Sequence, residues 1–599
     1  MKQSLYKLAL ATMITLSSTA ATQAQTLGCV DAQKGDKSFT LEDLNFGGKN
    51  YHNMSPKNRW CTWWGNQLVR QDTDACYLVN KTTGKETKLF GKNDINQWIA
   101  PTRDIKVHSL YQTSFPYANK SIVVVNTGSK IYTIDFKKHA LLSEHNFENG
   151  ENILETCPAS EAVAYLKDNN LYVTRGLKVW QLSTDGSRDI VYGQSVHRDE
   201  FGIRKGTYWS NDGEKLAFYR MDQSMVTDYP QVDIPEIGFN HPETQSCIAT
   251  AAPDKYPMAG ETSHKVTVGV FNLNTGKTVY LQAGEPTDRY FTNISWSPDS
   301  KTIYMFELNR DQNDCHLVAY NAETGEKQGE LYHETDEKYV EPQNPIVFLP
   351  WDSNSFIMQS RKDGYNHLYL CTLEKENKLN IRQLTSGKWE VMDMLGFNTK
   401  RKSIIIASNE LSPIQRNIFA VDVKSGKRTL ADDGGKGWHN ALLSTSGEYV
   451  YDNYSTPSIP RKIAIVNTAN GKATPFFTAE DPWKGYNVPE YSMGSIKNGD
   501  TELFYRMVKP INFDSTKKYP VVVYVYGGPH AHNVDARWHY SSRSWETYMA
   551  QKGYLCFILD NRGSEHRGKE FEQATFRQLG QVEMEDQMKG VEYLKTLPY

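Results

Sequence analysis

The chain has 599 residues, of which 39% are hydrophobic and 23% are charged, a balance typical of a folded globular protein and not of a disordered one. This length exceeds what a single hydrophobic core supports, so we expect at least two domains. The formal net charge is −3 and there is no long run of Lys and Arg, which excludes the basic surface that nucleic-acid binding requires.

The first 24 residues have the pattern of a secretory signal peptide. Lys2 and Lys7 make the start basic, residues 8–16 are apolar, and residues 22–24 (TQA) offer a small-residue cleavage site. The apolar run is too short for a transmembrane segment, which needs about 20 residues. We therefore expect an exported protein that is periplasmic, secreted or on the cell surface.

Eight cysteines are spread along the chain without a C-x-x-C pair. Disulfides are optional in an exported protein of this size, and their pairing cannot be read from the sequence. The sequence also contains no H-E-x-x-H motif and no cluster of Cys and His, so it implies no metal site and no cofactor.

Residues 53–482 contain many short predicted strands that recur with a period. The 35 Tyr and 13 Trp residues favour β structure, because such side chains fit pleated, half-buried surfaces. Four of the predicted strands end at a glycine turn: Gly276, Gly325, Gly426 and Gly471. These glycines are 49, 101 and 45 residues apart, so the middle interval should hold one unmarked repeat, near residues 367–370.

A period of about 45–50 residues with four strands is that of a β-propeller blade. We expect eight blades. Stacked β-sandwiches are the alternative, and they would explain the strands but not the period.

The pattern then changes to alternating strands and helices. Residues 519–526 (YPVVVYVY) predict a strand buried on both faces, because the run is continuously apolar. A helix is predicted around residues 545–549, a second buried strand over 554–559, and a second helix over 583–594 with an acidic first turn. The apolar face of the second helix consists of Met584, Met588, Val591 and Leu594. This order is the start of a parallel α/β sheet.

Three stretches of the second part resemble the hydrolase domain of the dipeptidyl-peptidase IV and prolyl tripeptidyl-peptidase family, which are prolyl-oligopeptidase-type serine peptidases. They are residues 524–529 (YVYGGP), 560–564 (DNRGS) and 585–587 (EDQ). The first part resembles the propeller of that family at residues 218–222 (FYRMD), 361–369 (RKDGYNHLY) and 383–391 (QLTSGKWEV). The resemblance runs from about residue 40 to the last residue, and the order and spacing of the stretches make it specific.

We therefore divide the chain into four parts: a signal peptide (1–24), an N-terminal segment expected to pack on the hydrolase domain (25–52), the β-propeller (53–482) and the N-terminal part of an α/β-hydrolase domain (483–599). In the family, the nucleophilic serine lies in a G-W-S-Y-G-G turn, and its acid and histidine follow. The 599 residues contain no G-x-S-x-G sequence. We expect the Ser/Asp/His triad beyond Tyr599 and an inactive chain as given, because the triad works as a unit.

The resemblance implies a serine-type dipeptidyl or tripeptidyl peptidase (EC 3.4.14-like) that acts through an acyl-enzyme. Its substrates would be peptides with a free N-terminus and with proline at the penultimate or third position, and no cofactor is implied. The choice between dipeptide and tripeptide release stays open, and so does the oligomeric state, a homodimer included.

The resemblance assigns Tyr526, at the end of the first buried strand, to the oxyanion hole. A phenol aimed at the developing oxyanion can contribute roughly 2.7–4 kcal/mol of transition-state stabilisation. Without the resemblance, a packed tyrosine at a strand end is the ordinary interpretation.

The resemblance also assigns Asp199 and Glu200 to an acidic pair on a propeller insertion that holds the α-ammonium group of the substrate. A carboxylate at a fixed distance from the nucleophile measures how many residues fit between them. The usual pair is Glu-Glu, and Asp199 is one methylene shorter, so we expect Glu200 to be the main anchor. The alternative is a solvated surface pair.

Arg562 is expected to be a local structural clamp, and His530 and His532 are expected to be loop residues rather than catalytic bases. Two other functions stay open. One is a non-catalytic propeller interaction protein or inactive homologue. The other is an acylaminoacyl or endo-acting peptidase, against which the pair Asp199 and Glu200 argues, because a blocked N-terminus carries no ammonium group.

Overall fold

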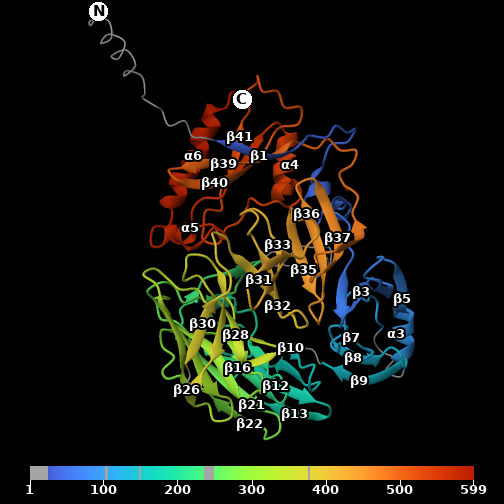
Figure 1. The fold of residues 1–599 in the computed structure, drawn as a ribbon, viewed down its shortest axis with the longest axis vertical. Helices are drawn as coiled ribbons and strands as arrows, with labels where there is room; N and C mark the ends of the chain where they lie inside the picture. Colours follow the sequence, from blue (N-terminus) through green and yellow to red (C-terminus); the bar gives the residue numbers. More distant parts are fainter. Residues whose placement is uncertain (1–23, 101–105, 148–149, 235–247, 376–377) are drawn as a thin grey trace, which may run out of the picture.

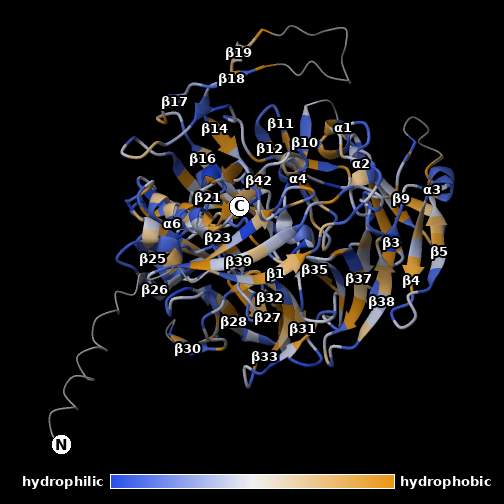
Figure 2. Ribbon diagram, turned by 90° about the horizontal axis from the view of Figure 1, so that it is seen from above, coloured by the Kyte–Doolittle hydropathy of each residue, from blue (hydrophilic) through white to orange (hydrophobic). Residues whose placement is uncertain are grey.

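The computed structural model describes residues 24–100, 106–147, 150–234, 248–375 and 378–599. The predicted signal peptide lies outside the described residues, apart from residue 24. The chain forms a ring of β-sheets and a smaller α/β part, which lies above the ring in Figure 1 and over its face in Figure 2. No helix among the described residues is long and apolar enough to cross a membrane.

Eight antiparallel sheets form the ring within the described residues, and each has four strands in sequence order, with one extra short strand in the fourth sheet. Blades one to three are β2 (Cys61–Trp64), β3 (Gln67–Gln71), β4 (Ala75–Val79), β5 (Glu86–Gly91); β6 (Thr113–Ser114), β7 (Ile122–Asn126), β8 (Lys130–Asp135), β9 (Ala140–Asn146); and β10 (Glu151–Thr156), β11 (Val163–Lys167), β12 (Asn170–Arg175), β13 (Lys178–Gln181). Blade four is β14 (Ile190–Tyr192), β15 (Thr207–Trp209), β16 (Lys215–Asp222), β21 (Lys265–Asn272) and β22 (Lys277–Tyr280), with the short pairs β17 (Asp228–Tyr229), β20 (Asp254–Lys255) and β18 (Val232–Asp233), β19 (Thr250–Ala251) inserted. Blades five and six are β23 (Arg289–Trp296), β24 (Thr302–Asn309), β25 (Asp314–Asn321), β26 (Lys327–Thr335); and β27 (Val347–Leu349), β28 (Asp352–Ser360), β29 (His367–Leu373), β30 (Leu379–Gln383). Blades seven and eight are β31 (Val391–Asn398), β32 (Ser403–Ser408), β33 (Asn417–Asp422), β34 (Arg428–Leu430); and β35 (Trp438–Leu443), β36 (Tyr449–Thr456), β37 (Ile459–Asn467), β38 (Ala473–Thr478).

The ring closes where the first blade meets the eighth. Leu68 and Val79 share a hydrophobic cluster with Ile463 and Ile465. The predicted eight-bladed propeller is therefore confirmed. The unmarked repeat in the middle glycine interval is also confirmed. The strands that end at the four glycines are each the third main strand of a blade, and β29 is the third strand of blade six, which lies in that interval.

The α/β part contains a five-stranded sheet with the order β1-β39-β40-β42-β41. Its strands are β1 (Gln25–Val30), β39 (Tyr491–Asn498), β40 (Thr501–Val508), β41 (Val521–Tyr524) and β42 (Leu555–Leu559). The helices of the described residues are α1 (Leu41–Leu44), α2 (Tyr51–Met54), α3 (Lys92–Trp98), α4 (Ser544–Gln551), α5 (Lys569–Glu572) and α6 (Val582–Thr596), with 3₁₀ turns η2 (His197–Asp199), η4 (Trp538–Ser541) and η5 (Gln573–Thr575). β41 and β42 are parallel and α4 connects them, so the predicted start of a parallel α/β sheet is confirmed.

The prediction that the first of these strands is buried on both faces is wrong. β41 is the last strand of the sheet, and the side chains of Val521 and Val523 are 41% and 39% exposed. On α6, Met584 and Met588 of the predicted apolar face are exposed as well. The apolar run at residues 519–526 correctly predicts a strand, but among the described residues no element covers the face of β41 that carries Val521 and Val523.

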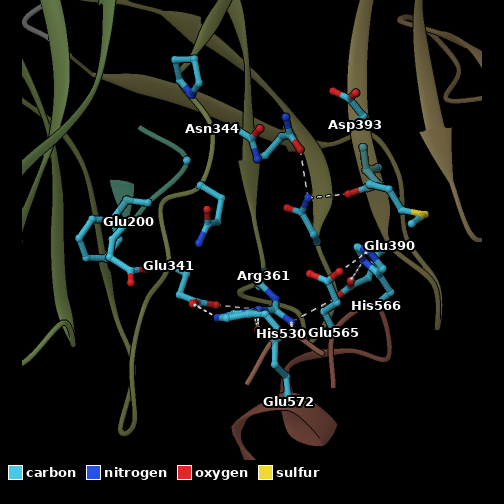
Figure 3. A pocket seen from close by; sticks show the side chains of 18 of the residues that line it. Glu200, Glu341, Asn344, Arg361, Glu390, Asp393, His530, Glu565, His566 and Glu572 are labelled. Carbon is cyan, nitrogen blue, oxygen red and sulfur yellow. Dashed lines mark hydrogen bonds and ion pairs between the residues drawn. The ribbon is translucent and has the colours of Figure 1, made fainter. Parts of the chain in front are cut away.

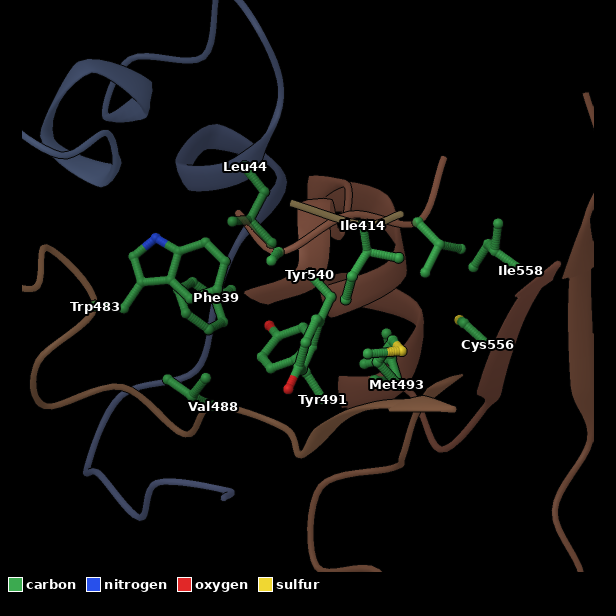
Figure 4. Packing of buried hydrophobic residues seen from close by; sticks show 14 of the residues in the cluster. Phe39, Leu44, Ile414, Trp483, Val488, Tyr491, Met493, Tyr540, Cys556 and Ile558 are labelled. Carbon is green, nitrogen blue, oxygen red and sulfur yellow. The ribbon is translucent and has the colours of Figure 1, made fainter. Parts of the chain in front are cut away.

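The N-terminal segment packs against the α/β part (Figure 4). Phe39 stacks on Tyr486 with ring centroids 4.5 Å apart and meets Trp483 edge-on at 4.9 Å. The side-chain amide of Gln551 on α4 accepts from the backbone N–H of Phe39 and donates to its carbonyl oxygen, both at 2.7 Å. The seven described cysteines are free thiols, and six of them are buried.

Candidate functional site

A cavity of about 620 Å³ lies between the propeller and the α/β part. Its wall carries seven carboxylates, from Asp199, Glu200, Glu341, Glu390, Asp393, Glu565 and Glu572. It also carries four basic side chains, from Arg204, Arg361, His530 and His566. Carboxylates therefore outnumber basic groups, and the cavity favours a cationic ligand. Figure 3 shows that Glu200 and Glu341 lie close to each other on one side of it.

A network of ion pairs crosses the boundary between the two parts. Arg361, which follows β28, forms a two-point pair with Glu572 of α5, with Nη1 2.7 Å from Oε1. The same guanidinium lies 3.0 Å from Glu341 and 3.3 Å from Glu390. His530 of the α/β part inserts between the carboxylates, with Nε2 3.2 Å from Glu341 and Nδ1 3.3 Å from Glu572.

These contacts determine the charges in the network. Hydrogen bonds to Glu341 and Glu572 raise the pKa of His530 to about 10, against the opposing effect of burial. Burial by itself would raise the pKa of Glu572, but hydrogen bonds from Arg361 and His530 outweigh it and lower the pKa. Glu341, His530 and Glu572 lie close enough to share a metal ion, but Arg361 and a protonated His530 already balance their charge.

A second histidine carries charge at the same boundary. His566 lies 3.1 Å from Glu565 and 3.7 Å from Glu390. Burial would lower its pKa, but the hydrogen bonds to these two carboxylates raise the pKa to about 9. Its backbone carbonyl accepts from the amide of Asn409 at 2.7 Å, which ties this loop to blade seven.

The segment that carries Glu341 is also fixed to the α/β part. Lys569 of α5 lies 2.6 Å from Asp336, and the amide of Gln573 donates to the carbonyl oxygen of Tyr339 at 2.8 Å. Lys338 donates to the carbonyl oxygen of Gln573 at 2.9 Å. Three contacts within six residues therefore hold Glu341 at the cavity.

The predicted acidic pair lies on a turn with an unusual backbone. His197, Arg198 and Asp199 all have positive φ, of 54°, 59° and 63°. Such left-handed geometry is unfavourable by about 1–2 kcal/mol per residue, so the surroundings must impose it.

His197 supplies that constraint. It is buried, and its Nε2 accepts the backbone N–H of Phe291 at 3.1 Å while its Nδ1 lies 2.8 Å from Nε2 of His264. Because Nε2 accepts, Nδ1 carries the proton and donates to His264. Burial and the neighbouring His264 lower the pKa of His197 well below its usual value, so the ring stays neutral.

One amide holds the two glutamates that face each other. Asn293 donates to the carbonyl oxygens of Phe201 and Pro342, which directly follow Glu200 and Glu341. The carboxylate of Glu200 itself makes no hydrogen bond or ion pair with another described side chain. Burial is the main cause that raises its pKa, and the charges of Glu341 and Asp199 add to the effect while His530 opposes it.

Hydrogen bonds to neighbouring segments of the α/β part fix the Y-G-G-P turn, residues 526–529. Gly527 has a φ of 76°, which favours glycine, and its carbonyl oxygen accepts from the amide of Asn561 at 3.2 Å. Gln587 of α6 donates to the side chain of Asn561 at 3.0 Å. Tyr526 is 64% exposed and is not among the residues that line the cavity.

The end of this turn borders a different cavity, which it shares with Glu200. Pro529, Glu200, Glu341 and His530 all border a second cavity of about 480 Å³. The structure thus brings Glu200 together with the end of the turn, whereas Asp199 lines only the first cavity and the ring of Tyr526 lines neither.

The structure also gives contacts for Arg562 and His530. Arg562 donates to Asp586 of α6 through its backbone N–H at 2.8 Å and through its guanidinium, which is the contact of a structural clamp. His530 lies in a loop as expected, but it is also the cation between Glu341 and Glu572. Sequence reasoning missed these carboxylates, because Arg361 and Glu572 are 211 positions apart and no local pattern connects them.

Comparisons with known proteins agree with this architecture. The family described as "Dipeptidyl peptidase IV (DPP IV) N-terminal region" matches residues 117–461, and the "Prolyl oligopeptidase family" matches residues 538–599. A crystal structure of a protein provisionally named dipeptidyl aminopeptidase IV, from Bacteroides ovatus ATCC 8483, is 45% identical with a TM-score of 0.85, over 94% of this chain and 80% of that chain. Porphyromonas gingivalis dipeptidyl peptidase 4 is 25% identical with a TM-score of 0.78 over the same shares.

Curated relatives are longer than this chain. A protein named "Probable dipeptidyl-aminopeptidase B" from Pyrenophora teres f. teres (strain 0-1) is 26% identical over 94% of this chain and 66% of its own length. The chain spans about half to two thirds of the length of the curated relatives it matches. With the propeller family matched over more than half of the 599 residues, the chain belongs to the dipeptidyl peptidase IV family.

Proposed function

We propose that the full-length protein is a serine exopeptidase that releases N-terminal di- or tripeptides ending in proline through an acyl-enzyme. The observation that carries the proposal is the carboxylate of Glu200, which has no partner among the described residues and borders both the acidic cavity and the second cavity, which Pro529 at the end of the Y-G-G-P turn also borders. The names of the relatives support peptidase activity, and the preference for proline rests on the family resemblance alone.

In this proposal Glu200 binds the α-ammonium group of the substrate. Glu200 is exposed as a whole and only partly desolvated, so its carboxylate is accessible to an incoming ammonium group, with which it would form a charge-assisted hydrogen bond. The ammonium group would also remove the repulsion between Glu200 and Glu341. Asp199 borders the same cavity and adds negative charge, but its shorter side chain makes Glu200 the main anchor.

Tyr526 would donate its phenolic O–H to the oxyanion that forms when serine attacks the substrate carbonyl. Its exposed side chain leaves the hydroxyl free to reach a substrate, and the turn behind it is fixed through Asn561 and Gln587. A donor that is already positioned stabilises the transition state without reorganisation.

The nucleophile would come from sequence beyond the 599 residues, which contain no G-x-S-x-G. The exposed valines of β41 and the exposed methionines of α6 support this proposal, because exposed apolar side chains suit packing against further elements of a hydrolase sheet. We expect the 599 residues by themselves to be inactive, since the triad acts as a unit.

The test compares the full-length enzyme with its Glu200→Gln variant on Xaa-Pro and Xaa-Xaa-Pro reporters and on a small ester that has no amine. Loss of one charged hydrogen bond should raise KM for the free-amine peptides by about tenfold to a hundredfold and leave hydrolysis of the ester almost unchanged. Glu323→Gln, in an exposed turn of blade five, is the matched control.

Equal effects on both substrates would remove the anchoring role of Glu200. A full-length gene without an intact G-x-S-x-G turn would instead favour a non-catalytic propeller protein. The ratio between the two peptide reporters decides between dipeptide and tripeptide release.

A further inference from the structure

A second cluster of ionisable side chains lies on the outer two strands of blade five, at the rim of the ring (Figures 1 and 2). Asp314 and His316 are two positions apart on β25, so their side chains share one face of the sheet. His333 on β26 pairs with His316 across the strands, and the two imidazole rings stack with centroids 4.3 Å apart. None of the three residues lines either cavity described above.

The potential ligand atoms converge. Oδ1 of Asp314 lies 2.6 Å from Nε2 of His333 and 3.2 Å from Nε2 of His316. One ligand atom from each of the three residues lies within 4.8 Å of the other two. Ligand atoms of zinc sit about 2.0–2.2 Å from the ion, so two of them on opposite sides are about 4 Å apart. The atoms are thus close enough for one ion, but the two stacked rings must tilt toward each other to bind it, because the lone pair of each ring nitrogen lies in the plane of its ring.

A fourth side chain has the position of an orienting group. A shift in the register of β25 and β26 places Glu330 opposite Val318. Oε2 of Glu330 lies 3.2 Å from Nδ1 of His316, on the far side of the ring from Asp314. Histidines that bind metal usually donate their second ring N–H to such a carboxylate, which fixes the tautomer and the direction of the ring.

When both histidines are neutral, the carboxylates of Asp314 and Glu330 carry two uncompensated negative charges. If His316 is neutral and donates from Nε2 to Asp314, its Nδ1 is a bare lone pair that faces the carboxylate of Glu330. That Nδ1 atom is buried and makes no hydrogen bond with a described residue. A cation bound at Nε2 would reverse the tautomer, so that Nδ1 carries the proton toward Glu330.

We propose that Asp314, His316 and His333 bind one divalent transition-metal ion of the Zn²⁺ class, with Glu330 as the orienting carboxylate of His316. Two imidazole nitrogens and one carboxylate oxygen suit zinc, and the half-exposed side chain of His333 leaves room for a water molecule as the fourth ligand. The cluster escapes a search for sequence motifs, because His333 meets the other two ligands only through the hairpin of β25 and β26.

The position of the site suggests what the ion does. β26 is an edge strand that pairs only with β25, and edge strands need protection. Three residues beyond His333, Asp336 begins the segment that contacts α5 and carries Glu341 to the cavity. The ion would therefore stabilise both the edge strand β26 and the start of the segment that carries Glu341.

The experiment uses the tag-free 599-residue chain, stripped with a chelator and titrated calorimetrically with ZnCl₂, with Co²⁺ as a spectroscopic substitute. We expect one equivalent to bind, with visible Co²⁺ bands of a four-coordinate site. His333→Asn and His316→Asn should each weaken binding by at least about a hundredfold, and Glu330→Gln by about tenfold to a hundredfold. His108→Asn, at an exposed position, is the control and should bind as the original chain does.

Circular dichroism of each variant establishes that it is folded. If His316→Asn does not fold, His333→Asn still tests the proposal, because the side chain of His333 is half-exposed and its replacement should leave the fold intact. The proposal is overturned if the chain binds no Zn²⁺ or if binding survives His333→Asn. It is also overturned if His530→Asn abolishes binding instead, because the ion would then sit at Glu341 and Glu572.

Discussion

Arg361 of the propeller and Glu572 of α5 form a two-point ion pair that joins the two parts of the molecule, with Nη1 2.7 Å from Oε1. The carboxylate of Glu572 is almost fully buried, at 2% side-chain exposure, and it also contacts His530. The pair thus positions His530, and His530 in turn borders both cavities. Contacts that hold the two parts together therefore also shape the candidate substrate site.

Replacing Glu572 by Gln should destabilise the junction. The variant keeps the size of the side chain but leaves Arg361 and His530 with fewer anionic partners, at a cost of about 2 kcal/mol. We expect a lower Tm and faster proteolysis between propeller and α/β part. Glu570→Gln, at an exposed position on the same helix, is the control, and equal Tm values for the two variants would contradict the role of the pair.

The junction should weaken as the pH rises. The pKa of His530 is raised to about 10 in the folded chain, whereas an unfolded histidine titrates near about 6.5. A group whose pKa is raised by folding stabilises fully below its unfolded pKa, and this stabilisation is lost as the pH rises through the folded pKa. Between about pH 7 and 10 the Tm of the original chain should therefore fall more steeply than that of His530→Gln.

The comparison isolates His530, because the variant retains His566, whose pKa is also raised. Thermal unfolding of both proteins across this pH range is the measurement. Parallel curves would show that His530 does not carry the extra proton.

Changing Tyr526 to Phe in the full-length enzyme should lower kcat by roughly a hundredfold or more and change KM little. The lost hydroxyl stabilises only the transition state in the proposed mechanism. Steady-state kinetics on the preferred peptide reporter measures the effect, with Tyr519→Phe as a control on the same segment. An unchanged kcat would return Tyr526 to a structural role.

Arg506 and Glu546 form a pair inside the α/β part that is more buried still, with side-chain exposures of 1% and 0%. Glu546→Gln should lower stability by about 3–5 kcal/mol, because it leaves Arg506 buried without its counter-charge. The double variant Arg506→Met with Glu546→Leu should lose less than either single change. Calorimetric unfolding checks this order, and a double variant less stable than both singles would refute it.

Local patterns predicted much of the architecture. The spacing of Gly276, Gly325, Gly426 and Gly471 indicated blades, and β29 lies where the unmarked repeat was expected. The strand over residues 554–559 is buried as predicted, in β42. These predictions succeed because strand alternation and turn chemistry act within a few residues.

The same local information was insufficient for β41. Its apolar composition indicates a strand, but the exposure of Val521 and Val523 depends on which elements lie beside the sheet. Composition reflects the surroundings that a strand suits, whereas burial is a property of the assembled elements.

The sequence by itself determined the repeating blades, the α/β order and the motifs that identify the family, since each is written in residues close together along the chain. Only the tertiary structure decided that Glu341, Arg361 and Glu572 meet around His530, and that Asp314 and His316 meet His333. Charges interact through distance in space, and folding brings together groups that no sequence pattern connects.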